Sequence, residues 1–170
     1  MTIKLIGAVL IIAACGAFGY RIAAAHKREE RTLKNLICAL DFMECELQFR
    51  MTALPELCRQ TAEETNGILA KIFVSLADEL ESQICPDVKS CMTAVLSNIK
   101  EIPSKTLESL LLLGQSLGRF DLQGQLKGLE TVRQECRIKL NKIMGNSDVR
   151  TRSYQTLGIC AGAALVILLM

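Results

Sequence analysis

The sequence predicts an all-α fold, a bundle of about six antiparallel helices flanked by a transmembrane helix at each end. Three observations support this prediction. Aromatic residues make up only 4% of the chain, Trp is absent and three Pro occur, which favours helix over sheet. Through the middle of the chain, apolar residues recur every three or four positions, as on one face of a helix. Both ends of the chain are continuous apolar runs.

The two apolar ends are each close to the length of a membrane-spanning helix. The first covers residues 5–20 and extends to Ala25, and the last covers residues 157–170 and extends back to Tyr154. A spanning helix needs ~20 apolar residues, with roughly 17 as the lower limit. We therefore divide the chain into an N-terminal anchor, a helical domain and a C-terminal anchor, at residues 1–25, 26–152 and 153–170.

The basic residues next to the anchors indicate which side of the membrane the domain occupies. The flanking bases are Arg21, Lys27, Arg28, Arg31, Lys34, Arg150 and Arg152. On the outer side of the two apolar runs, only Lys4 and the amino terminus, before the first run, carry positive charge, and no basic residue follows the second. Because short cytoplasmic flanks are enriched in Lys and Arg, the domain is predicted to be cytoplasmic and both termini external.

A second interpretation of the N-terminal run remains open. Ile12, Ala13 and Ala14 precede Cys15 as small and apolar residues precede the lipidated Cys of a bacterial lipoprotein. In that case the chain would begin at Cys15 and the bundle would be exported. A double-anchored sensor with an extracytoplasmic bundle would need the same orientation, which the basic flanks oppose.

The first helix of the domain is predicted to continue from the N-terminal anchor. It has one apolar stripe of six residues, Leu33, Leu36, Ile37, Leu40, Met43 and Leu47. A second stripe lies beside it, formed by Cys38, Phe42, Cys45 and Phe49. Since two adjacent stripes make a broad apolar face, we expect this helix to be central in the bundle.

Shorter helices are predicted to follow, separated by capping and turn residues. Thr52 is a possible cap for a helix over residues 55–65, which ends near Asn66 and Gly67. The next stripe runs through residues 69–84. Pro86 and Asp87 then suit the start of a helix over residues 88–99, because Pro fits a first turn and Asp the positive end of the dipole.

Two more helices complete the domain. Pro103 opens one that runs to Leu117. Gly118 marks a tight turn and Asp121 an N-cap, and a long stripe follows over residues 122–143. Residues 145–148 form a possible joint before the second anchor.

The charge pattern favours a docking surface over nucleic-acid binding. The net charge is only +2, which gives no electrostatic support for a nucleic-acid partner. Between residues 41 and 87, however, the sequence has ten acidic residues and only three basic ones. Solvated helix faces are the ordinary explanation of such acids. The alternative is a partner surface, for which Glu63, Glu64, Asp78 and Glu79 are the candidates.

The sequence offers no constellation of residues for catalysis, metal binding or cofactor binding. The eight Cys include no C-x-x-C pair, and the only His, His26, lies in a basic flank. Nucleotide-binding and nucleophile-elbow motifs are absent as well. We therefore predict a protein that is not an enzyme and has no small-molecule substrate, with its Cys acting as small buried apolar residues in a reducing compartment.

One motif in the C-terminal anchor relates to membrane packing. Gly158 and Gly162 form a G-x-x-x-G pattern, which lets another helix approach closely in lipid. The first anchor, which contains Ala13, Gly16 and Ala17, is a candidate partner.

Across its length the chain resembles the stage III sporulation protein AB family of endospore-forming bacteria. The resemblance rests on residues 4–9, 114–121 and 157–170 in this order. The central bundle is also similar to the cytoplasmic F domain of type II secretion and type IV pilus platform proteins, which share a Gly-Glu-x-x-Gly turn. Gly114, Gln115 and Gly118 occupy that turn here, with Gln115 in place of the acid.

The family resemblance implies a role in the channel complex between mother cell and forespore. The protein would then sit in the mother-cell-derived outer forespore membrane with its bundle in the mother-cell cytoplasm. Its partners would be other channel proteins and the cytoplasmic secretion-type ATPase, stage III sporulation protein AA. It would act as a platform that passes contact from this motor to its membrane neighbours.

Overall fold

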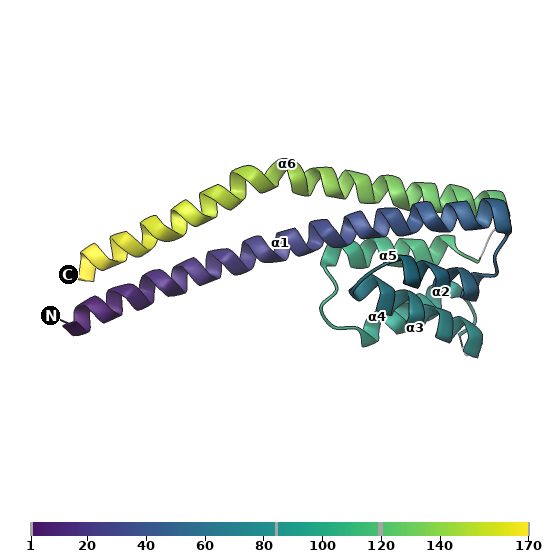
Figure 1. Cartoon of the computed structure of the whole chain (residues 1–170), viewed down its shortest axis with the longest axis horizontal. Helices are drawn as coiled ribbons and strands as arrows, with labels where there is room; N and C mark the ends of the chain where they lie inside the picture. Colours follow the sequence, from purple (N-terminus) through teal and green to yellow (C-terminus); the bar gives the residue numbers. More distant parts are fainter. Residues whose placement is uncertain (1, 84, 119–120, 170) are drawn as a thin grey trace. The chain divides into compact units, whose positions relative to one another are not determined.

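The chain folds into helices alone over the part that the structure describes (Figure 1). This computed structural model describes residues 2–83, 85–118 and 121–169, with side chains except for residues 2–20, 22–23 and 146–169. The all-α prediction is confirmed, with six helices and no strand in the described residues. The helices are α1 (Thr2–Arg50), α2 (Leu54–Glu64), α3 (Ile68–Ser82), α4 (Val88–Asn98), α5 (Ser104–Ser116) and α6 (Leu122–Leu169).

The chain divides into two compact units. One is Glu29–Asn141, which contains the short helices and the adjoining parts of α1 and α6. The other consists of Met1–Arg28 and Lys142–Met170 and is helical wherever it is described. The predicted anchors belong to the second unit and lie largely outside the residues with described side chains. Among the described residues, no helix has both the length and the apolarity to cross a membrane.

Two predicted helix starts are confirmed by capping hydrogen bonds. The backbone N–H of Ser90 donates to the Asp87 side chain at 2.8 Å, at the start of α4. The backbone N–H of Gly124 donates to the Asp121 side chain at 3.0 Å, at the start of α6. Each aspartate accepts from an N–H that has no partner within its helix and offsets the positive end of the helix dipole.

Two other local predictions are wrong. Thr52 does not cap α2, whose N-cap is Ala53, because the Thr52 hydroxyl donates instead to Glu46 at 3.2 Å. This bond ties the chain that leaves α1 back to α1 itself. The joint expected at residues 145–148 is absent, since α6 continues through it as helix. A lone Gly is compatible with a helix interior at a cost of about 1 kcal/mol relative to Ala.

The core of the Glu29–Asn141 unit is built by the stripes that the sequence predicts. On α1, the stripe from Leu33 to Leu47 is buried against the bundle, apart from the partly exposed Ile37. The α3 stripe contributes Leu69, Ile72, Phe73 and Leu76, all fully buried. Consecutive short helices pack on each other, α2 on α3, α3 on α4 and α4 on α5. Short connections make these neighbours antiparallel, as predicted.

The second apolar stripe of α1 is not part of this core, so the expectation that both stripes form one broad face packed inside the bundle is wrong. Cys38 and Cys45 are exposed, Phe49 is 76% exposed and Phe42 is partly exposed. The reason is geometric. At 100° per residue the second stripe lies nearly opposite the Leu33 stripe, so when the Leu33 stripe packs on the bundle the second stripe faces away from it.

Ion pairs fasten the long helices within this unit. The Arg133 guanidinium on α6 contacts Asp41 at 2.7 Å and Glu44 at 2.6 Å on α1, and it also pairs with Glu130 on its own helix. Arg133 is only 19% exposed. A planar fork shared by several carboxylates restricts both helices more than a single surface pair would.

A matched pair of substitutions in α3 tests the position of the core. Leu76→Asp should lower the free energy of unfolding by roughly 4 kcal/mol or more, because it buries an unpaired carboxylate at a fully buried site. Val74→Asp on the same helix should change it by only about 0.5 kcal/mol, since Val74 is 47% exposed. Denaturant unfolding followed by circular dichroism measures both. Equal losses would contradict this orientation of α3.

Candidate functional site: an acidic groove between α3 and α4

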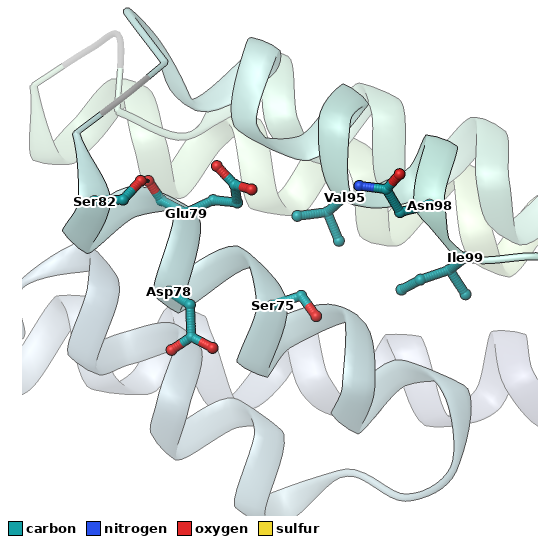
Figure 2. Close-up of a pocket in the computed structure, with 7 residues that line it drawn as sticks. All are labelled: Ser75, Asp78, Glu79, Ser82, Val95, Asn98 and Ile99. Carbon is teal, nitrogen blue, oxygen red and sulfur yellow. Dashed lines mark hydrogen bonds between the residues drawn. The ribbon is translucent and has the colours of Figure 1, made fainter.

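A groove of about 350 Å³ lies between α3 and α4 (Figure 2). Its seven lining residues are Ser75, Asp78, Glu79, Ser82, Val95, Asn98 and Ile99. In Figure 2 the Glu79 carboxylate extends toward α4, whereas the Asp78 carboxylate, at the edge of the same face of α3, is directed away from α4. The groove therefore combines an acidic wall with amide and apolar groups.

Helical spacing explains the α3 wall. Ser75, Asp78, Glu79 and Ser82 stand at intervals that bring side chains to one face of a helix. Opposite them, Val95 is 3% exposed and forms an apolar base. The sequence prediction included Asp78 and Glu79 but not the serines or the α4 residues. The spacing on α3 was a usable signal, whereas the pairing with α4 was not visible in the sequence.

Glu79, one of the two acids of this wall, stands at the unfavourable end of its helix. It falls in the last turn of α3 together with Glu81, which lies outside the groove, and this turn has no basic residue. The C-terminal end of a helix carries partial negative charge, so acids there are repelled by the helix dipole. Arg59 of α2 offsets part of this repulsion, because its guanidinium contacts Glu81 at 2.6 Å and Asp78 at 3.3 Å. Glu79 is left facing the groove.

The other two predicted acids lie at the opposite end of the α2–α3 hairpin. Glu63 and Glu64 are exposed residues in the last turn of α2. Asp78 lies roughly 15 Å further along α3, at ~1.5 Å of rise per residue. The structure thus brings Asp78 and Glu79 together but does not join them to Glu63 and Glu64. The predicted surface is two acidic pairs.

The predicted turn motif occupies the end of α5, where two glycines permit close packing. An alanine methyl at Gly114 would lie 2.8 Å from Cβ of Met92 on α4. Gly118 follows the helix with φ of +73°, and a methyl there would lie 2.5 Å from Val88. Gln115 is exposed between them. The glycines therefore hold α5 against α4, and the side chain between them is free to contact a partner.

The six described cysteines differ in exposure, and Cys85 is half-buried. Cys58, Cys91 and Cys136 are buried as predicted; burial raises the pKa of Cys58 to about 12, and burial together with the neighbouring Cys85 raises that of Cys91 to about 11. These thiols are unreactive near neutral pH because the thiolate is the reactive form. Cys38 and Cys45 are exposed, which contradicts the prediction of buried apolar residues.

The remaining predictions concern metal binding and the packing of the C-terminal anchor. Among those residues, no three His, Cys, Asp or Glu side chains gather closely enough to hold a metal ion. Gly158 and Gly162 fall in α6, but their packing lies outside the residues with described side chains.

Comparisons with known proteins agree with one another. The profile of a protein family, described as stage III sporulation protein AB, matches residues 4–170. The chain is similar to "Stage III sporulation protein AB" of Bacillus subtilis (strain 168), with 24% identity over 174 residues, covering 99% of both chains. It is also similar to a solved structure of "Stage III sporulation protein AB (SpoIIIAB)", with a TM-score of 0.60 and 19% identity over 71% of this chain and 97% of that chain.

The contact between α4 and α5 can be tested at Gly114. Gly114→Ala should destabilise the protein by about 1–3 kcal/mol, because the added methyl overlaps Met92 and one of the two helices must shift. Gly145→Ala is the matched control. No atom lies within 4 Å of that methyl, so the change should stabilise α6 by about 0.5–1 kcal/mol. Thermal unfolding of both variants measures the difference, and destabilisation by Gly145→Ala alone would contradict the packing.

Proposed function

Because this chain belongs to the stage III sporulation protein AB family, we propose that it is a structural component of the channel complex between mother cell and forespore. In this role it is a platform that contacts the cytoplasmic ATPase of the complex, stage III sporulation protein AA. Its partners are proteins and a membrane. The mechanism is mechanical, since contact with the motor passes through the bundle to neighbours in the membrane.

Membrane attachment at both ends is part of this proposal. Its support is the sequence, in which residues 5–25 and 154–170 are nearly continuous apolar runs with basic residues on the domain side. The bundle then faces the mother-cell cytoplasm from the outer forespore membrane. Two attachments restrict rotation of the bundle, which suits a part that must resist force.

The acidic groove is the observation that best supports a docking role. Its Glu79 opposes the dipole of α3, so helix stability does not account for an acid at this position. A basic partner surface would offset that repulsion and add charge pairs to Glu79 and Asp78. The apolar base at Val95 and the amide of Asn98 would give such a partner a place to insert a side chain. We therefore propose the groove as the contact site for the ATPase.

The spatial separation of the two acidic pairs allows a matched test of docking. In the full chain in detergent, Asp78→Lys with Glu79→Lys should weaken binding to the ATPase by about tenfold or more, since charge reversal at an interface repels the partner. The unmodified contact should also associate more slowly as salt rises. Titration calorimetry measures the affinity.

The control has the same change in charge at the far end of the hairpin. Glu63→Lys with Glu64→Lys should leave binding within about twofold, because these residues lie roughly 15 Å from Asp78 along α3. Equal loss of binding in both variants would indicate a diffuse charge effect and exclude the groove as the contact site. Unchanged binding in the groove variant would also exclude the groove as the contact site.

Topology is tested by accessibility of the two ends and the domain. Single reporter fusions should place residues 29–148 in the cytoplasm and Met170 outside, because basic flanks follow the first run and precede the second. Mass spectrometry of the mature N-terminus should show that residues 1–14 are retained. A chain that begins at a lipidated Cys15, or a bundle that labels from outside, would favour the lipoprotein or sensor interpretation.

A further inference from the structure

The exposed face of α1 has the spacing of a coiled-coil seam. Cys38, Phe42, Cys45 and Phe49 follow one another at four, three and four residues, which is the alternation of a and d positions in a heptad. The same spacing extends back through Asn35 to Arg31. In this register Asn35, Phe42 and Phe49 hold a positions, and the cysteines and Arg31 hold d positions.

This seam stands apart from the core of its own bundle. At 100° per residue, the seam points away from the fully buried Leu36 and Leu40. On the side toward α6, Asp41 and Glu44 bind Arg133. The fold therefore fixes α1 with its Leu stripe inward and the seam outward.

Exposure of this seam in an isolated chain is unfavourable. Free Cys is among the most buried residue types, yet Cys38 and Cys45 are both exposed one heptad apart. Phe49 is 76% exposed on the same stripe. The α6 helix also has exposed apolar residues, Ile138 and Met144, but their six-residue spacing does not form a stripe. An ordered apolar seam indicates a helix partner that covers it.

We propose that the seam pairs with the same seam of a second copy of this chain, in parallel and in register. Such a pair places each Phe42 and Phe49 against its equivalent, and paired rings are favourable by about 0.5–1.5 kcal/mol beyond their burial. The polar Asn35 at an a position specifies two-stranded pairing and register. The parallel direction rests on the proposed attachment of both copies to one membrane.

The apolar area of the seam is too small to hold two copies together tightly by itself. Two Phe side chains of ~150–250 Å² each fall short of the ≈ 800 Å² per partner of a stable interface. Confinement in one membrane raises the effective concentration of a second copy, as a short linker does to the millimolar range. The G-x-x-x-G of the C-terminal anchor, Gly158 and Gly162, favours the same association. Anionic headgroups near Arg31 offset the repulsion between the two copies.

Native thiols make the pairing measurable. The full chain is placed in vesicles of phosphatidylglycerol and phosphatidylethanolamine, with Cys15, Cys85 and Cys160 changed to Ala. One variant then keeps Cys38 and carries Cys45→Ser, and the other keeps Cys45 and carries Cys38→Ser. Copper(II)–phenanthroline removes two electrons and two protons from two thiols as the disulfide forms. Each variant should give a disulfide-linked dimer, because parallel, in-register pairing places each seam Cys beside the same residue of the second copy.

Charge on the seam provides the matched controls. Phe49→Glu should lower the cross-linked fraction at least fivefold, whereas Ile138→Glu, at a position that is 54% exposed on α6, should leave it unchanged. The substituted Phe49 side chain is largely exposed, so circular dichroism should show an intact fold. Phe49→Glu should also leave ATPase binding unchanged, since the groove lies on α3 and α4.

The outcomes separate this pairing from the proposed docking to the ATPase. Loss of ATPase binding by the groove variant with cross-linking intact supports both. Absence of a dimer from both variants that keep one seam thiol overturns the seam and leaves the proposed role of the groove unaffected. A dimer that is insensitive to Phe49→Glu also overturns the seam, because the bridge then forms by random collision.

Discussion

The bundle depends on the contact of Arg133 with α1. This residue lies on the last helix, α6, and its guanidinium binds Asp41 and Glu44 on the first helix, α1. It therefore joins the first and last helices of the chain. The pair energies are modest, because Asp41 is 47% exposed and exposed pairs contribute about 0.2–1 kcal/mol. Its larger effect is orientational. With two acids turned to α6 and the leucines turned inward, α1 has one remaining face, and that face is the seam.

A second set of contacts closes the bundle at the start of α5. Glu29 of α1 accepts a hydrogen bond from the backbone N–H of Lys105 at 3.1 Å, and so caps a helix whose own N-cap, Pro103, has no polar side chain. Lys139 of α6 donates to Ser109 of α5 at 3.1 Å. Burial lowers the pKa of Lys139, but hydrogen bonds to Glu135 and Glu108 outweigh it and raise the pKa overall. Its contribution to stability is therefore present at neutral pH and lost only as pH rises through that raised value.

The sequence predicted what depends on local chemistry and missed what depends on packing partners. Periodicity located all six helices, and Asp87 and Asp121 were identified as caps because a cap acts within three residues. Glu29 as the cap of α5 could not be predicted, since its partner is far away in sequence. The exposure of Cys38 and Phe49 was missed for the same reason. Periodicity finds an apolar face, but only the arrangement of the other helices decides which apolar face is covered.

The same distinction explains how the site was predicted in part. Asp78 and Glu79 were identified by charge alone, and Glu63 and Glu64 were joined to them because an acidic stretch looks continuous in sequence. An antiparallel hairpin separates such residues, since the ends of its two helices point in opposite directions. The groove on α3 and α4 and the seam on α1 consequently belong to different elements. A partner that binds the groove has no need to displace a helix on the seam, so contact with a motor and pairing between copies are physically compatible in one assembly.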